Sequence, residues 1–288
     1  MPTYIPSIQK ALLLSWLLPY SIFAQFRGLP LPSELKEISG LASLHDQQLW
    51  GLNDGGNAPI LYQIDTKTGV IIETSAPGVN NVDWEELCTD NIGRFWIADI
   101  GNNLNNRQNL RFYRFDPASG QVDSLLFSFP DQVAFPPKRE ADWNFDTEAV
   151  VWKNDTLHLF TKSRFRGRHF TKHYQLPAQP GNHQAQLVDS LYLPKRAVTG
   201  AALSHDGQEL VLIAYYFKRK PLPYTRATLY HFSNFENNRF LKGEKRTKRL
   251  PKWFFARQFE SVVYFKESWW VANEQLLWQR PRLWKLRF

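Results

Sequence analysis

One short segment recurs five times along the chain, each time with a polar or acidic residue near the start of an otherwise apolar run. The copies lie at 38–42, 84–88, 147–151, 198–202 and 259–263. Their second residues are 46, 63, 51 and 61 residues apart. Periods of this size, with loops of variable length, predict one supersecondary unit repeated five times.

Two further apolar runs follow each copy at similar distances. The second runs are at 49–52, 95–98, 157–160, 210–214 and 269–272, and the third at 61–65, 112–116, 173–176, 229–232 and 283–286. Alternation and a high content of Trp, Phe, Tyr, Leu and Val predict strands for these runs. Four units have a fourth run, at 70–74, 121–129, 186–193 and 239–250.

Five four-stranded units predict an all-β fold, a five-bladed β-propeller, because radially arranged blades bury their faces against each other. The fifth unit reaches Phe288 without a fourth strand. Residues 25–35 are a spare segment that could complete that blade and close the ring. No helical periodicity of useful length competes after residue 24, so we expect a single domain over 25–288.

The first 24 residues have the pattern of a secretory signal peptide. They carry one charged residue, Lys10, before an apolar run and end in Ala24. The run is short for a membrane span, which makes a retained anchor the weaker alternative. We therefore expect a secreted or periplasmic protein without a membrane span after cleavage. The single cysteine, Cys88, excludes an intramolecular disulfide and matches small apolar residues in the other repeats.

The chain is basic, with a formal charge of +8, and much of the excess lies in 242–252. Lysines on a solvated outer strand protect a sheet edge, which explains this segment without a polyanionic partner. No nucleic-acid motif accompanies it, so we expect no nucleic-acid partner. We expect a monomer whose partner is a small anionic ligand or another protein.

The second residues of the repeats are expected to meet at the propeller axis, because they occupy one position of five equivalent inner strands. They are Ser39, Glu85, Glu148, Thr199 and Glu260. Three carboxylates in a narrow channel repel each other by about 4 kcal/mol per close pair at an effective dielectric near 20. Oxygen-only donors in a wide ring predict a hard cation, with Ca²⁺ favoured over compact Mg²⁺. Alternatively, hydrogen bonds or arginine partners stabilise the glutamates, and the ring is structural.

The second strands all end on the same face, and polar residues follow each of them. These are Asn53, Asp54, Asp99, Asn102, Asn103, Lys162, Tyr215 and Glu274. Taken singly, the Gly-rich loops are ordinary turns, but five at one offset indicate a shared pocket. Basic residues of the same loops predict an anionic ligand, and they are Arg107, Lys162, Arg164 and Arg226.

The ring positions resemble those of the calcium-activated nucleotidase (apyrase) family, five-bladed propellers in which they are Ser, Glu, Glu, Ser and Glu around one calcium. Here Thr199 replaces the second serine. The repeat also looks like that of the SdiA-regulated and phytase-esterase-like propellers. The resemblance spans the mature chain in motifs of three or four residues. The resemblance implies a propeller fold and a calcium site more than it implies a nucleotidase activity. The nucleotidases' base-binding and phosphate-binding residues do not match this chain one by one.

Two functions fit these patterns. The first is a binding module that captures an anionic ligand or a protein partner on its polar face, with a structural calcium. The second is a calcium-dependent hydrolase of phosphate esters or anhydrides. In that reaction Asp54 or Asp99 would activate water, and Lys162 with Arg164 would offset phosphoryl charge. No Ser-His-Asp constellation, phosphate-binding loop or zinc spacing is present.

Overall fold

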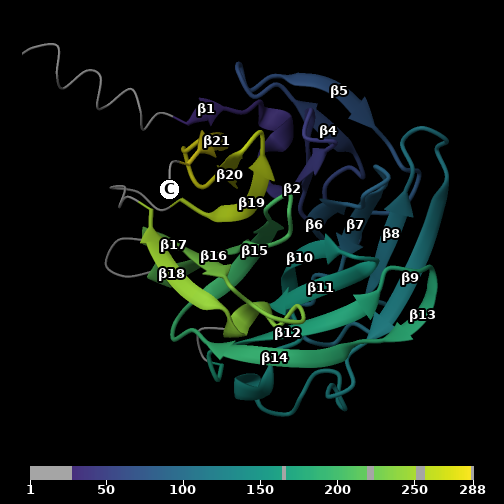
Figure 1. The fold of residues 1–288 in the computed structure, drawn as a ribbon, viewed down its shortest axis with the longest axis vertical. Helices are drawn as coiled ribbons and strands as arrows, with labels where there is room; N and C mark the ends of the chain where they lie inside the picture. Colours follow the sequence, from purple (N-terminus) through teal and green to yellow (C-terminus); the bar gives the residue numbers. More distant parts are fainter. Residues whose placement is uncertain (1–27, 164–166, 219–223, 251–256, 287–288) are drawn as a thin grey trace, which may run out of the picture.

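Five sheets stand around one axis in the computed structural model, with strands succeeding each other from the axis to the rim (Figure 1). The structure describes residues 28–163, 167–218, 224–250 and 257–286. The predicted signal peptide, 1–24, and Arg164 lie outside this part of the chain. Among the described residues, no helix has the length and apolarity needed to cross a membrane.

Each sheet is one blade, and its strands follow the chain from the inside outward. Blade 1 is β2 (Ile38–Leu44), β3 (Gln48–Asn53), β4 (Leu61–Ile64) and β5 (Ile71–Ser75). Blade 2 is β6 (Trp84–Thr89), β7 (Phe95–Asp99), β8 (Arg111–Phe115) and β9 (Val122–Ser128). Blade 3 is β10 (Thr147–Lys153), β11 (Thr156–Thr161), β12 (Phe170–Pro177) and β14 (Gln186–Tyr192). Blade 4 is β15 (Ala197–Leu203), β16 (Leu210–Lys218), β17 (Tyr224–Ser233) and β18 (Glu244–Arg249).

Blade 5 combines both ends of the described chain. It contains β19 (Phe259–Phe265), β20 (Ser268–Asn273), β21 (Arg282–Lys285) and, outermost, β1 (Leu29–Pro30). Strand β1 pairs antiparallel with β21, which confirms that the N-terminal segment completes the last blade. Three short 3-10 helices, η1 (Ser33–Leu35), η2 (Glu140–Asp142) and η3 (Phe240–Lys242), interrupt the connections.

Blade 2 has one strand more than the repeat predicts. Strand β13 (Gly181–Gln184) belongs to the β12–β14 connection of blade 3, yet it pairs in parallel with β9. It covers the outer edge of blade 2 with backbone from the next blade. Sequence reasoning did not identify this strand, because its four residues are polar and partly exposed and show no apolar alternation.

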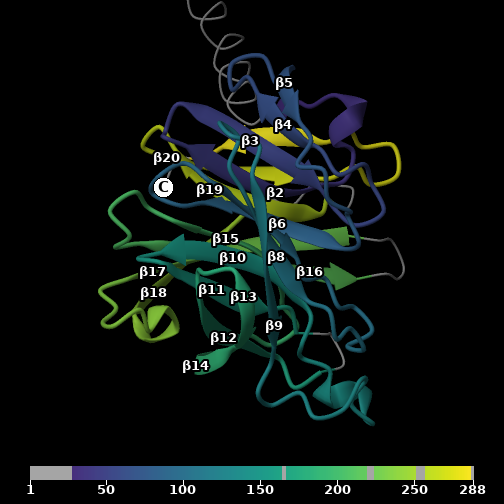
Figure 2. The same ribbon diagram turned by 90° about the vertical axis from the view of Figure 1, so that its right-hand side faces the viewer.

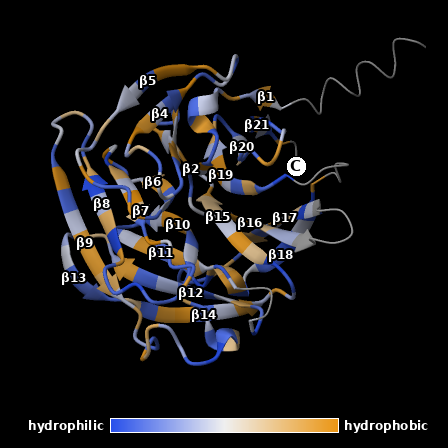
Figure 3. Ribbon diagram, turned by 180° about the vertical axis from the view of Figure 1, so that it is seen from behind, coloured by the Kyte–Doolittle hydropathy of each residue, from blue (hydrophilic) through white to orange (hydrophobic). Residues whose placement is uncertain are grey.

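The core consists of five clusters of buried apolar side chains, one at each junction between neighbouring blades. Apolar and polar residues alternate as bands along the strands (Figure 3). Both faces of a blade are therefore buried by its neighbours, as the propeller solution requires.

The two faces of the ring differ in what they carry. The inner strands begin on the face that also carries the loops after β3, β7, β11, β16 and β20, which we call the loop face. Figure 2 shows the ring from its edge, with the loop of η2 projecting from it. The tight turns between first and second strands lie on the opposite face, which we call the turn face. The expected functional residues gather on the loop face.

A hydrogen-bonded histidine pair is buried between blades 3 and 4. His158 Nδ1 lies 3.0 Å from His173 Nε2, and His173 Nδ1 lies 3.2 Å from Asp189 Oδ1. Burial lowers the pKa of His158 to about 3, and burial also lowers that of His173. Both pKa shifts favour the neutral rings in the folded protein. The contribution of His158 to stability is present above pH 6.5 and lost as the pH falls toward 3.

We expect His158→Leu to reduce the acid sensitivity of folding. Between pH 7 and pH 5, the wild type should lose about 2 kcal/mol more of its unfolding free energy than the variant, because a histidine that protonates only in the unfolded state costs about 1.4 kcal/mol per pH unit. Urea unfolding at both pH values measures the difference, with the exposed His45→Leu as control. An equal loss of unfolding free energy in the variant and the wild type between pH 7 and pH 5 would contradict the prediction.

Candidate cation site on the loop face

Every predicted ring position lies on a β-bulge at the start of an inner strand. In each blade the pairing between the first two strands skips one residue, and the skipped residues are Ser39, Glu85, Glu148, Thr199 and Glu260. A bulge leaves its extra residue outside the ladder and bends the strand. Each inner strand contacts the inner strand of both neighbouring blades, so the five bulges surround the axis.

The three glutamates of the ring come together in a buried environment. Glu85, Glu148 and Glu260 are only 3%, 4% and 9% exposed. Burial raises the pKa of all three carboxyl groups above their usual range. At Glu85 the next largest cause is repulsion from the Glu148 carboxylate. The convergence predicted from the repeat is therefore present in the structure.

Ser39 and Thr199 donate hydrogen bonds across blade boundaries, and their role as metal ligands stays a prediction. The Ser39 hydroxyl donates to the backbone carbonyl of Glu85 in the next blade. The Thr199 hydroxyl donates to the carbonyl of Phe259, likewise in the next blade, over 2.9 Å. The two hydroxyl groups thus join inner strands across blade boundaries.

Two of the three ring glutamates have partners within the protein. Glu148 forms an ion pair with the Lys162 ammonium, which reaches it from the end of β11. Glu260 accepts a hydrogen bond of 3.1 Å from Gln258 Nε2, which also donates to Glu274. Burial, followed by repulsion from Glu260, raises the pKa of Glu274 to about 9. Glu148 and Glu260 thus have partners within the protein, and their role as metal ligands stays a prediction.

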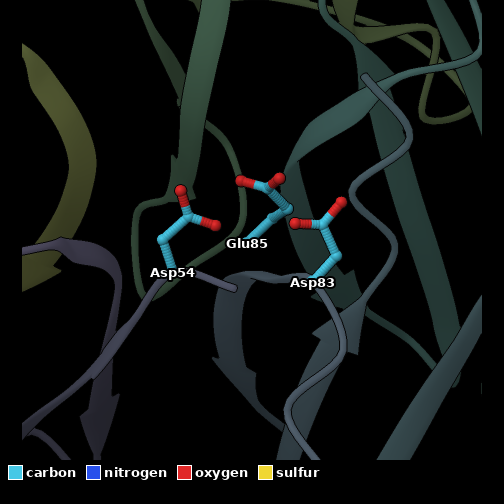
Figure 4. A group of neighbouring side chains, drawn as sticks. All are labelled: Asp54, Asp83 and Glu85. Carbon is cyan, nitrogen blue, oxygen red and sulfur yellow. The ribbon is translucent and has the colours of Figure 1, made fainter. Parts of the chain in front are cut away.

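Glu85 is the exception, because no hydrogen bond or ion pair to another described residue satisfies its carboxylate. One oxygen each of Asp54, Asp83 and Glu85 lie within 4.8 Å of one another. Figure 4 shows the three carboxylates turned toward a common space, Asp54 from the loop of blade 1 and the other two from blade 2. Burial, followed by repulsion from Asp54, raises the pKa of Asp83 to about 6.

Gly101 keeps the space beside these carboxylates open. A Cβ atom at this position would collide with Glu85 Oε1 and with the carboxylate of Asp83. The loop after β7 therefore passes close to the carboxylates because it has no side chain there. An oxygen-only set of three carboxylates, one of them buried without a partner, fits a hard divalent cation.

A second acidic group shares Glu85 with the first. One oxygen each of Glu85, Asp146 and Glu148 also lie within 4.8 Å of one another. Sequence reasoning missed Asp83 and Asp146, although a signal was present. Each stands two residues before a ring glutamate, in Asp83-Trp84-Glu85 and Asp146-Thr147-Glu148. An Asp-x-Glu pattern that recurs in two of five repeats indicates that both carboxylates face one site.

Asp99, one of the two expected catalytic carboxylates, is fully buried and has structural partners. Its Oδ1 accepts hydrogen bonds from Arg107 Nη2 at 2.8 Å and from the backbone N–H of Asp83 at 3.1 Å. Arg107 also donates to the carbonyl of Gly101 at 2.7 Å. This placement favours a role for Asp99 and Arg107 in shaping the loop over the catalytic and anion-binding roles expected from sequence.

The remaining expected residues divide between buried supports and exposed positions. Asn53 is buried and donates to the carbonyl of Glu34 at 2.6 Å. Asn102 is buried and donates to the carbonyl of Phe145 at 3.1 Å, whereas Asn103 is exposed. Tyr215 is buried close to Glu260, and Arg226 is half-buried at the edge of the face.

Comparisons with known proteins show a similarity in fold alone. No protein-family model matches the chain, and no curated protein matches it. Among solved structures, virginiamycin B lyase from Staphylococcus aureus has a TM-score of 0.46 at 7% identity, covering 91% of this chain and 88% of that one. A putative gluconolactonase gives 0.45 at 9% identity, covering 88% and 77%.

Hydrazine synthase from Kuenenia stuttgartiensis gives a TM-score of 0.43 at 12% identity, covering 86% of this chain. This chain spans 58% of that protein. Likenesses this distant carry no argument about chemistry. None of these three structures is a calcium-activated nucleotidase or an SdiA-regulated propeller by its description, so both resemblances remain predictions.

Proposed function

We propose that this protein binds one Ca²⁺ ion between blades 1 and 2 and uses it to hold an anionic ligand, or an acidic segment of a protein partner, on the loop face. The ligands from the protein are Asp54, Asp83 and Glu85. The protein acts outside the cytoplasm, as expected from residues 1–24, and it acts as a monomer.

The observation that carries this proposal is the Glu85 carboxylate. It is 3% exposed and has no hydrogen bond or ion pair among the described residues, while two further carboxylates approach it. An unpaired buried carboxylate is costly unless a cation or a proton compensates it. A divalent ion would compensate all three groups at once.

The bound ion would also explain how an acidic site could hold an anion. Calcium takes six to eight oxygen ligands, and three carboxylates leave some positions for a ligand. Without the ion, the five carboxylates of the two overlapping groups outnumber the two described cations paired with them, Lys162 and Arg107, and would repel an anion. Binding of the anionic ligand is therefore expected to require the cation.

We expect calcium to stabilise the folded protein by an amount that grows with the logarithm of its concentration above Kd. At 100 times Kd, mass action adds about 2.7 kcal/mol to the unfolding free energy. Calorimetric titration of chelator-treated protein should give one site. Glu85→Gln should weaken binding at least tenfold, and the exposed Glu73→Gln should not. The proposal would be overturned if the wild type bound no calcium and if neither calcium nor chelator changed its melting temperature.

Gly101→Ala offers a steric test that leaves every charge in place. The added methyl group would displace the carboxylates of Glu85 and Asp83, which are movable ends of side chains. We expect calcium affinity to fall at least tenfold, while the melting temperature in chelator changes little. Unchanged affinity in this variant would show that the ion binds elsewhere.

Calcium-dependent hydrolysis of a phosphate ester or anhydride is the second candidate. It is favoured by the position of Asp54, which lies in the carboxylate cluster and close enough to Lys162 for their charges to interact. Phosphate release should be assayed on purified protein with nucleotides and sugar phosphates, with and without calcium. Turnover that requires calcium and that survives in Asp99→Asn but is lost in Asp54→Asn would support this function over binding alone.

A further inference from the structure

Lys162 lies where a second cation would otherwise be expected. The residue follows β11, and its ammonium forms an ion pair with Glu148, a member of the acidic group Glu85, Asp146 and Glu148. Its side chain is 19% exposed, so the charge is largely withdrawn from water. The two acidic groups are alike in composition, and each has one described cation beside it. Lys162 is in direct contact with a ring glutamate, whereas Arg107 lies 3.9 Å from Asp83, which is not a ring residue.

Glu85 connects the two groups. Its carboxylate belongs to both, is nine-tenths buried and has no partner of its own among the described residues. In such a geometry, one carboxylate can bridge two divalent ions. Here the half of the site beside Glu148 has an ammonium in direct contact with a ring glutamate. In the half beside Asp54, Arg107 Nη1 lies 3.9 Å from Asp83 Oδ2, but the guanidinium makes its shorter contact, 2.8 Å, with Asp99. No described cation pairs with Glu85 itself.

We infer that Lys162 is a built-in second cation, which limits the site to a single metal ion and places a fixed positive charge beside it. This inference rests on the proposed cation site. It assigns the metal to the Asp54 half and identifies Lys162 as the residue that sets the metal stoichiometry. An ammonium has three N–H donors, and Glu148 accepts from one of them, so an oxyanion on the metal could also be held by Lys162.

The inference predicts that Lys162→Met converts a one-ion site into a two-ion site. Methionine has a similar length without the charge, so the group Glu85, Asp146 and Glu148 becomes available to an ion. Calorimetry with Ca²⁺ and Tb³⁺ luminescence on the full chain should give one ion for the wild type and two for the variant. Lys162→Arg, which retains the charge, and Lys67→Met, which removes an exposed one, should each give one ion.

The outcomes separate this inference from the proposed function. Binding of one ion by both wild type and Lys162→Met would overturn the role of Lys162 and leave the calcium site intact. Failure of the wild type to bind any ion would overturn the proposed function itself. If Lys162→Met unfolds in chelator, millimolar calcium should restore its folding, because a second ion replaces the lost charge. A variant that stays unfolded in calcium contradicts the inference.

Discussion

Deletion of residues 25–35 is expected to lower the unfolding free energy by more than 5 kcal/mol, enough to unfold a typical domain at physiological temperature. The deletion removes β1, whose Leu29 pairs with Leu283 of β21. It also removes Leu31 and Leu35, which are 4% and 0% exposed in the core between blades 1 and 5. Each buried leucine contributes about 2–5 kcal/mol by comparison with alanine.

Hydrogen bonds add to this loss. The backbone N–H of Leu31 donates to the carbonyl of Pro281 at 3.0 Å, and Arg282 Nη1 donates to the carbonyl of Gly28 at 2.6 Å. Without the segment, β21 becomes an open edge in a ring whose other blades are complete. Open edges of this kind favour association, so the truncated protein should also aggregate.

Urea unfolding followed by circular dichroism measures the effect. Leu35→Ala should give a partial loss of about 2–5 kcal/mol, and the exposed Val70→Ala should be nearly neutral. An unchanged midpoint for the truncated protein would mean that the ring closes without its N-terminal strand.

The repeat predicted the fold because each copy must bury the same faces. Apolar alternation located the inner, second and third strands in all five blades, and the missing fourth strand of the last blade pointed to the N-terminal segment. The fourth strands were predicted less well. The segment 239–250 was expected to be one strand, yet it divides into η3 and β18, because Phe240 and Leu241 turn into the core as a 3-10 turn.

The site was predicted in outline, and its chemistry depended on contacts that a repeat cannot specify. Equivalent positions in a repeat share a backbone location, and so the five ring residues do meet. Whether a carboxylate is paired depends on side chains from other loops. Lys162 pairs with Glu148, and Gln258 reaches Glu260, whereas Glu85 receives neither. The candidate cation site is therefore off-centre between blades 1 and 2.

Asp99 and Arg107 also show that a sequence pattern does not specify which side chains pair. A carboxylate at a strand end and an arginine in the following loop look like functional groups in the sequence. In the structure they pair with each other, over 2.8 Å between Arg107 Nη2 and Asp99 Oδ1. Their observed contacts hold the loop that brings Gly101 close to Glu85. Asp83 and Asp146, by contrast, lie in the acidic groups and were not singled out in the sequence.

The residue after Glu85 is a further carboxylate that breaks the repeat. Glu86 corresponds to Gly40, Ala149, Gly200 and Ser261 in the other copies. It is fully buried inside the inner ring of strands. Burial raises its pKa well above the usual range, although hydrogen bonds from three backbone N–H groups act to lower it. Its Oε1 accepts from the backbone N–H groups of Leu87 at 3.0 Å and Leu41 at 3.4 Å. Its Oε2 accepts from that of Ala201 at 3.3 Å.

These three donors belong to the inner strands of blades 1, 2 and 4, so one side chain joins three blades across the axis. Toward the turn face, a cavity of about 300 Å³ opens, and its lining includes Leu41, Leu87 and Ala201. Small residues in the other copies leave room for the Glu86 carboxylate. The side chain thus satisfies N–H groups that have no strand partner on the inside of the ring.

Glu86→Ala is accordingly expected to lower the unfolding free energy by about 3–5 kcal/mol, because it leaves buried N–H groups without an acceptor and opens a void. Glu86→Gln keeps the shape and one carbonyl acceptor, so its loss should be smaller, about 1–3 kcal/mol. If an acceptor is what the ring lacks, acetate or formate should recover part of the stability of Glu86→Ala and leave the wild type unchanged. Equal melting temperatures for the wild type and Glu86→Ala would show that water replaces the carboxylate at no cost, and that the blades do not depend on this contact.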